Sequence, residues 1–116
     1  MFMNVANIKT AEHYSWGDNC DGWYLLKSAE LTIIQERMPP GAAEAEHRHT
    51  KSRQFFYVLS GTATMSCDGV SAVLNAGDGL EIPPGVVHQI ANLGTTPLEI
   101  IVTSQPPSHG DRVDGK

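Results

Sequence analysis

Three of the five histidines stand at spacings that could bring them to one metal ion. His47 and His49 are two residues apart, so in an extended strand both side chains point to one face while Arg48 points to the other. Neutral imidazole is the commonest metal ligand in proteins, and His88 and Gln54 could supply a third and a fourth donor atom. The alternative is that His47 and His49 lie at a solvated strand edge and that a backbone carbonyl satisfies His88.

The elements that must position these residues are expected to be short strands. Segments rich in β-branched and aromatic residues recur along the chain, each bounded by Gly, Pro, Asn or Asp, and no long stretch keeps a 3.6-residue period. We expect strands at 23–26, 31–38, 53–59, 62–67, 70–74, 79–82, 87–92 and 98–103. Short strands in this number predict a closed or double-sheet antiparallel barrel, which leaves few exposed edges.

Several turns should join these strands. The pair Asp68–Gly69 accepts the positive φ angles of a two-residue type I′ turn, and Ser60–Gly61 is expected to form a second hairpin. The Pro-Pro-Gly segments at 39–41 and 83–85 should each end a strand, because proline cannot donate to a sheet ladder.

Fixed spacings extend the histidine pattern into two motifs. From Gly41 the sequence reads G-x5-H-x-H-x4-Q-x6-G as far as Gly61, and from Gly77 it reads G-x5-P-x-G-x2-H-x3-N as far as Asn92. These motifs resemble the two motifs of the cupin family, with Gln54 in place of the usual glutamate. The segment 16–23 is also similar to a subgroup of small, stand-alone, single-domain bacterial cupins.

The resemblance implies an all-β, double-stranded β-helix (jelly-roll) barrel that holds one divalent metal ion, with Mn, Fe, Ni and Zn all open. The implied ligand positions are His47, His49, Gln54 and His88. A carboxamide oxygen is neutral, whereas a carboxylate would cancel one unit of metal charge. We therefore expect Gln54 to leave the metal more electrophilic and less tightly bound, and to require another group as general base.

The chain should be one cupin domain. Its 116 residues are enough for one hydrophobic core and too few for two ordinary domains. We place the barrel core at about 22–104. The last residues, 105–116, are polar and rich in proline, without alternation, and are predicted to form a tail.

Charge and composition argue against nucleic acid and membranes as partners. Eight Lys and Arg stand against thirteen Asp and Glu, a net charge of −5, and no basic run could neutralise a row of phosphates. No apolar stretch approaches the ~20 residues of a membrane-spanning helix. The N-terminus lacks the pattern of a secretory signal, and Cys20 and Cys67 have no CxxC spacing, so we expect reduced thiols and a cytoplasmic location.

Other side chains are candidates for the wall of the pocket. If Ser60–Gly61 is a two-residue turn, counting back from it places Cys67 opposite Gln54 on the metal-facing side, although a small buried hydrophobe is the favoured interpretation of Cys67. Polar contacts to a substrate could come from Gln35, Glu36, Arg37 and Tyr57, although a half-exposed strand explains them as well. We expect a core or interface role for Trp16, Trp23, Phe55 and Phe56, turn support from Asp78 and Asn92, and solvation of His13 and His109.

The first functional hypothesis is a metal-dependent enzyme acting on a small oxygenated molecule, with isomerase, lyase and dioxygenase chemistry all open. The alternative is a non-catalytic cupin that binds a sugar or another small ligand, and a structural or storage role is a third. Cupins of this size commonly pair through their sheets. The apolar strands at 31–34 and 98–102 would suit such a contact, so we expect a homodimer.

Overall fold

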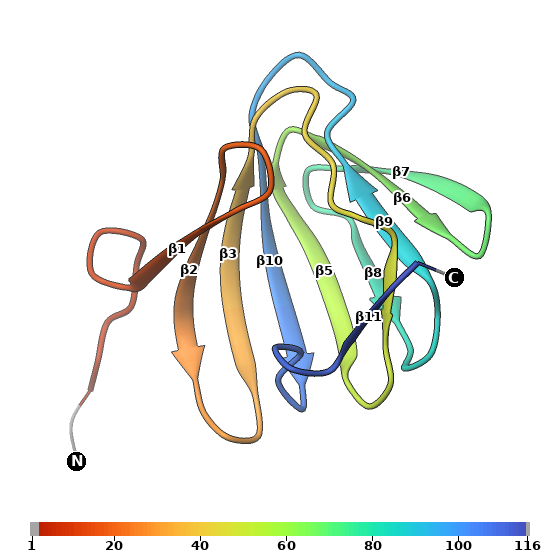
Figure 1. Cartoon of the computed structure of the whole chain (residues 1–116). Coiled ribbons are helices and arrows are strands. Elements are labelled where there is room, and N and C mark those ends of the chain that lie inside the picture. The colour runs from red at the N-terminus through yellow and green to blue at the C-terminus, as the bar shows by residue number, and fades with distance from the viewer. Residues whose placement is uncertain (1–2, 116) are drawn as a thin grey trace.

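The computed structural model of the protein describes residues 3–115, which contain eleven β-strands and no helix (Figure 1). The strands are β1 (Glu12–Trp16), β2 (Cys20–Lys27), β3 (Thr32–Met38), β4 (His47–His49), β5 (Arg53–Ser60), β6 (Thr62–Cys67), β7 (Val70–Asn75), β8 (Gly79–Ile82), β9 (His88–Ala91), β10 (Leu98–Gln105) and β11 (Arg112–Asp114). The prediction of an all-β chain is confirmed. The described residues accordingly include no helix long and apolar enough to cross a membrane.

Two antiparallel sheets face each other across the interior (Figure 1). The six-stranded sheet has the order β1-β2-β3-β10-β5-β8, and the five-stranded sheet has the order β11-β4-β9-β6-β7. Strands far apart in the sequence are neighbours, as where Leu98 of β10 lies opposite Met38 of β3. This is the predicted jelly-roll arrangement, in which the chain passes back and forth between the two sheets.

The inner faces of β5 and β10 change from polar to apolar along their length. On β5, Gln54, Phe56 and Val58 are buried while the residues between them are exposed, as expected for a strand with one face on the core. On β10, Ser104 lies opposite Gln54 and Ile100 lies opposite Val58. The apolar ends join the hydrophobic core, whereas the polar ends leave uncharged side chains inside the barrel.

Most of the predicted turns are present. Asp68 and Gly69 have φ angles of 48° and 82° and join β6 to β7 with Cys67 opposite Val70, which is the expected two-residue hairpin. Strands β3 and β8 each end just before a Pro-Pro-Gly segment. The glycines of these two segments have φ angles of 86° and 85°, which other residues rarely adopt.

The predicted hairpin at Ser60–Gly61 is wrong. β5 pairs with β10 and β8, whereas β6 pairs with β7 and β9, so these two residues carry the chain from one sheet to the other. Gly61 has a φ angle of 82°, and a Cβ there would lie 2.6 Å from the carbonyl oxygen of Pro97. Glycine is required by this close crossing rather than by a hairpin.

The position predicted for Cys67 fails with that hairpin. Cys67 lies opposite His88 on β9, not opposite Gln54, and packs against the hydrophobic core. Its surroundings agree with the alternative of a small, partly buried hydrophobe. Both Cys20 and Cys67 are free thiols, as expected.

The C-terminal residues do not form the predicted tail. β10 continues to Gln105, and β11 pairs antiparallel with β4 so that Asp114 lies opposite His47 (Figure 1). Two further hydrogen bonds hold this part of the chain: Ser52 Oγ donates to the carbonyl of Pro106 at 2.6 Å, and the amide of Gly115 donates to the carbonyl of Glu46 at 2.8 Å. We call residues 106–115 the C-terminal strap.

Candidate metal centre

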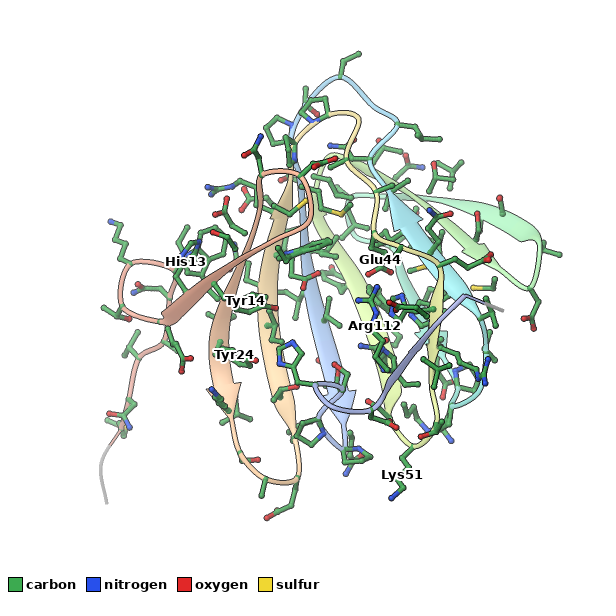
Figure 2. The ribbon with its side chains drawn as sticks, in the orientation of Figure 1. His13, Tyr14, Tyr24, Glu44, Lys51 and Arg112 are labelled. Atoms are coloured by element: carbon green, nitrogen blue, oxygen red, sulfur yellow. The ribbon has the colours of Figure 1, made fainter. Side chains whose placement is uncertain are left out.

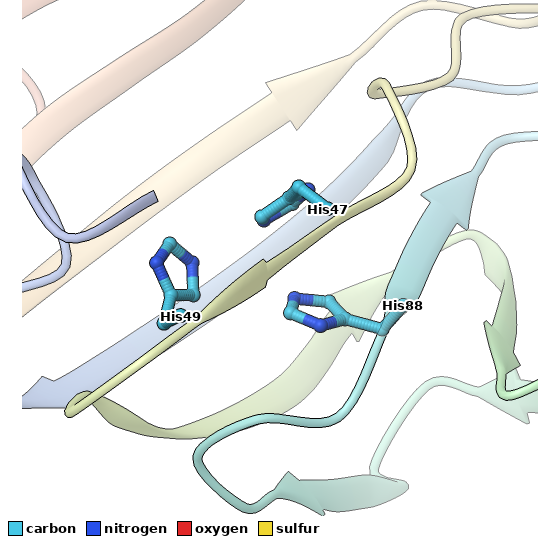
Figure 3. A group of neighbouring side chains, drawn as sticks. All are labelled: His47, His49 and His88. Atoms are coloured by element: carbon cyan, nitrogen blue, oxygen red, sulfur yellow. The ribbon is translucent and has the colours of Figure 1, made fainter. Parts of the chain in front are cut away.

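Three buried histidines from two neighbouring strands meet inside the barrel (Figure 3). His47 and His49 both point inward from β4, as their two-residue spacing predicts, and His88 of β9 lies directly opposite His47. One ring nitrogen of each of the three lies within 4.8 Å of the others. The three side chains are therefore positioned to hold one metal ion.

Each imidazole is oriented by a backbone carbonyl. The Nδ1–H groups donate as follows: His47 to Ala45 at 2.8 Å, His49 to Asp111 at 3.0 Å, and His88 to Val86 at 2.9 Å. A carbonyl oxygen can only accept a hydrogen bond, so in each neutral ring the proton lies on Nδ1 and the lone pair on Nε2. A carbonyl that accepts from Nδ1 in this way fixes the orientation of the imidazole ring and keeps it in the tautomer whose Nε2 can bind a metal.

Burial also keeps these rings uncharged. It lowers the pKa of His47 to about 4, and it lowers the pKa values of His49 and His88 below their ordinary range. The hydrogen bonds to carbonyl oxygens oppose part of this effect without reversing it. All three rings are therefore neutral at pH 7, which is the form that binds a metal.

Two buried acceptor atoms have no protein partner. Gln54 donates from Nε2 to Ser104 Oγ at 3.0 Å, which leaves Gln54 Oε1 without a hydrogen bond, and His88 Nε2 also lacks one. A buried polar atom left unpaired costs about 1–3 kcal/mol of stability. Gln54 lines the same cavity as His47 and His49, and neutral nitrogen and oxygen donors suit a first-row divalent ion. The residues present therefore fit the metal that the cupin motifs imply.

The cavity beside the histidines has a volume of about 180 Å³. Its walls come from both sheets and from the C-terminal strap, and the lining residues are Tyr14, Trp16, Ile34, Glu36, Glu44, His47, His49, Gln54, Phe56, Val102, Ser108, His109, Gly110 and Arg112. A space of this size restricts any ligand to a small molecule.

Two carboxyl groups line this cavity: Glu36 is one of the polar contacts expected from the sequence, and Glu44 is not. Glu36 points inward from β3, and Glu44 lies in the segment between β3 and β4, with its Oε1 accepting from the amide of Ile90 at 3.2 Å. Burial raises the pKa of Glu36 to about 7 and the pKa of Glu44 to about 8, and in Glu44 the neighbouring Glu36 adds to the rise.

Tyr14 completes this part of the cavity. Its hydroxyl donates to Glu36 Oε2 at 3.2 Å, and burial raises the pKa of Tyr14 above its usual range, so it remains a donor. The ring lies over Gly22 of β2, where a Cβ would stand 2.3 Å from the Tyr14 ring. Gly22 therefore makes room for the tyrosine that contacts Glu36. Figure 2 shows Tyr14, Glu44 and Arg112 coming from three different parts of the chain.

The other sequence candidates divide between the two faces of the sheet. Glu36, Trp16 and Phe56 line the cavity, together with His109, which is hydrogen-bonded to the hydroxyl of Tyr24 as well as exposed to solvent. The outward-facing candidates are Trp23, Gln35, Arg37, Phe55 and Tyr57. Outside the cavity, His13 is exposed and bonded to Asp21, while Asp78 and Asn92 support turns, as expected.

Asp111 ties the C-terminal strap to the histidine cluster. Its carboxylate accepts from the backbone amides of Thr50, Lys51 and Ser52 at 3.2, 2.9 and 2.8 Å, and also from the Thr50 hydroxyl. The backbone carbonyl of the same residue accepts from Nδ1 of His49. The carboxylate thus anchors the peptide group that orients one of the three histidines.

The sequence over residues 34–104 matches the cupin domain family. The chain belongs to this family. This cupin is 33% identical over 88 residues to an uncharacterised protein of Methanocaldococcus jannaschii, a match that covers 75% of this chain and 70% of the relative. The chain is 31% identical over 65 residues to an oxalate-binding protein of Thermotoga maritima, covering 56% of this chain and 54% of the relative.

Solved structures agree with the family assignment. An RmlC-like cupin from Shewanella frigidimarina superposes with a TM-score of 0.83 at 27% identity, covering 94% of this cupin and 96% of that chain. Several other relatives are much longer proteins, of which this cupin spans between 13% and 19%. The fold and the family expected from the two motifs are confirmed.

Proposed function

We propose that this cupin is a metal-dependent enzyme that acts on a small oxygenated substrate. The proposed ligands of one divalent ion are His47, His49, Gln54 and His88. The main support is the convergence of the three histidine nitrogens. Two buried acceptor atoms of the proposed ligand set, His88 Nε2 and Gln54 Oε1, also have no hydrogen-bond partner in the protein. A bound divalent ion, whether Mn, Fe, Ni or Zn, would supply Lewis-acid polarisation of a substrate oxygen.

Glu36 is the proposed proton carrier. At pH 7 its raised pKa leaves it near half-protonation, so it can both accept and return a proton. In the proposed step, a Glu36 carboxylate oxygen takes a proton from a substrate carbon next to a carbonyl, and the electron pair of the broken C–H bond stays on the substrate. Tyr14 donates to the other carboxylate oxygen and keeps the group in place. Isomerase or lyase chemistry is therefore favoured over oxygenation.

The alternative function is a non-catalytic cupin that binds a small ligand. The similarity to the oxalate-binding protein of Thermotoga maritima favours it. A binding protein could use the same metal and the same cavity, but its function would not depend on a proton carrier. Glu36 therefore separates the two functions.

Hydrogen exchange is the test of this proposal. Mn²⁺-loaded protein in D₂O is expected to catalyse exchange of carbon-bound hydrogen in at least one member of a panel of small hydroxyketones and hydroxyaldehydes, followed by NMR. Glu36→Gln should lower the exchange rate about 10²- to 10⁴-fold at unchanged metal content, because an amide cannot accept the proton. Tyr14→Phe should have a smaller effect, since it removes only the hydrogen bond.

Glu99→Gln is the matched control for that experiment. Glu99 lies on the outer face of the six-stranded sheet, paired with Arg37. The Glu99→Gln variant should therefore catalyse hydrogen exchange in the substrate at the wild-type rate. Equal rates in wild type and Glu36→Gln would refute the role of Glu36. Binding of a panel member without any exchange would support the binding function instead.

We also propose that the protein is a homodimer that pairs through the outer face of the six-stranded sheet. Leu26, Phe55, Tyr57 and Leu59 expose 42%, 46%, 40% and 43% of their surface there. Exposed apolar groups gathered on one face favour association with a matching surface. Light scattering at micromolar concentration should give the mass of two chains, and Tyr57→Asp should shift it toward one. A wild type that is only monomeric would rule out this pairing.

A further inference from the structure

The charges in the cavity suggest what kind of ligand it accepts. The proposed metal ligands are three neutral imidazoles and one neutral amide, so none of them offsets the two positive charges of a divalent ion. Two carboxyl groups, Glu36 and Glu44, line the same cavity. These carboxyls can supply the negative charge that a glutamate ligand would otherwise bring.

Among the described lining residues, Arg112 is the cationic side chain that could receive an anion. Its Nε donates to the carboxylate of Asp114 at 2.6 Å, which offsets part of its charge within the C-terminal strap. The charge of Arg112 also lowers the pKa values of Glu44 and of the three histidines. The cavity therefore offers an incoming anion two carboxyl groups against one guanidinium, which is already paired with Asp114.

Each of the two carboxyls keeps one oxygen available. Glu36 accepts from Tyr14 through Oε2, and Glu44 accepts from the amide of Ile90 through Oε1. Within residues 3–115, no hydrogen bond engages Oε1 of Glu36 or Oε2 of Glu44. An ionised carboxylate oxygen can only accept, so its natural partner is a donor such as a ligand hydroxyl.

We propose that Glu36 and Glu44 make this cavity select uncharged, hydroxyl-bearing ligands and reject carboxylates and phosphate esters. This inference rests on the proposed metal site. A divalent ion beside the two carboxyl groups would favour their ionised form. When ionised, they would balance the charge of the ion, so a neutral ligand leaves the cavity neutral while an anion adds unpaired negative charge. A ligand with hydroxyl groups can coordinate through one oxygen and donate to the two free carboxylate oxygens. The protein thus differs in specificity from its oxalate-binding relative.

Binding of oxalate tests the role of the two carboxyls. Oxalate is titrated calorimetrically at pH 8 into Mn²⁺-loaded wild type, Glu36→Gln/Glu44→Gln and the control Glu99→Gln, while electron paramagnetic resonance verifies that Mn²⁺ stays bound. The double variant should bind oxalate at least about tenfold more tightly than wild type and the control, because like charges no longer face the anion. Equal oxalate affinities in all three proteins would overturn the inference.

A second measurement needs no variant. Mn²⁺-loaded wild type should bind dihydroxyacetone more tightly than dihydroxyacetone phosphate, two ligands that differ only in the phosphate group. Tighter binding of the phosphate ester would overturn the inference even if the double variant fails to fold. Failure of the metal site itself is recognised separately, since the wild type would then retain no Mn²⁺ before any ligand is added.

Discussion

Replacing His88 by alanine should lower the affinity for a divalent metal by at least about 100-fold. The change removes one of three converging imidazoles and leaves His47 and His49 with the neutral amide of Gln54 as the third donor. Loss of an outer hydrogen-bond partner alone typically costs 10- to 100-fold in metal affinity, and loss of a ligand should cost more. Competition with a chromophoric chelator, using Zn²⁺ and Ni²⁺, measures the effect.

His13→Ala is the matched control, because His13 is exposed on β1 and hydrogen-bonded to Asp21, outside the cavity. Its metal affinity should equal that of wild type. Gln54→Glu should raise the metal affinity about tenfold above that of wild type, since a carboxylate adds an attractive charge. The hydroxyl of Ser104, which now accepts from the amide, can rotate to donate to the new carboxylate. Unchanged affinity in His88→Ala would contradict the assignment of this ligand.

Loss of the Asp111 carboxylate should have the second largest effect. Asp111→Ala removes the acceptor of three backbone amides and of the Thr50 hydroxyl, so the C-terminal strap loses its anchor beside His49. His49 then loses the carbonyl that fixes its tautomer. We expect the metal affinity to fall about 10- to 100-fold and the melting temperature to fall as well. Chelator competition and calorimetry measure the two effects.

The pH dependence of this anchor has a definite sign. The Thr50 hydrogen bond, together with the backbone amides, lowers the pKa of Asp111 to about 2. A carboxyl with a depressed pKa stabilises the fold fully above its unfolded pKa, near 4, and loses that contribution as the pH falls through about 2. The difference in melting temperature between wild type and Asp111→Ala should therefore be constant from pH 5 to pH 7.

Val113→Ala is the control on the same strap, because the side chain of Val113 is exposed and Val113 lies opposite Arg48 rather than opposite a histidine. It should keep the wild-type metal affinity. If Asp111→Ala also keeps it, the strap has no part in orienting His49.

The histidine cluster was predictable because it depends on local geometry. Two histidines at a spacing of two share a strand face, and the motif spacing identified His88 as the third member before the pairing of β4 with β9 was known. The Asp68–Gly69 turn was predictable for a similar reason, since its φ angles follow directly from its two residue types. Such features need no knowledge of distant parts of the chain.

The remaining features depend on contacts between distant segments. The crossing at Gly61 has the sequence of a hairpin turn, but its glycine is required by the carbonyl of Pro97. Glu36 shares the inward alternation of Ile34 and Met38, a signal that could have separated it from the outward-facing candidates Gln35 and Arg37. Glu44 had no such signal, because it lies in a segment without regular alternation.

The strap was missed for a related physical reason. β11 is only three residues long, which is too short to show a hydrophobic alternation, and all three of its residues are exposed. One carboxylate of the strap, that of Asp111, accepts hydrogen bonds from residues 50–52 and so helps to hold β11 beside β4. A side chain bonded to backbone amides some sixty positions earlier leaves no local pattern in the sequence.

Metal analysis of protein purified without an affinity tag tests the central claim most directly. Wild type, His47→Ala and His88→Ala are each exposed to equal mixtures of Mn²⁺, Ni²⁺ and Zn²⁺, passed through a desalting column and measured by inductively coupled plasma mass spectrometry. The wild type should retain close to one divalent ion per chain, and both variants should retain only a small fraction of that. Equal metal content in all three proteins would contradict a metal centre at these histidines.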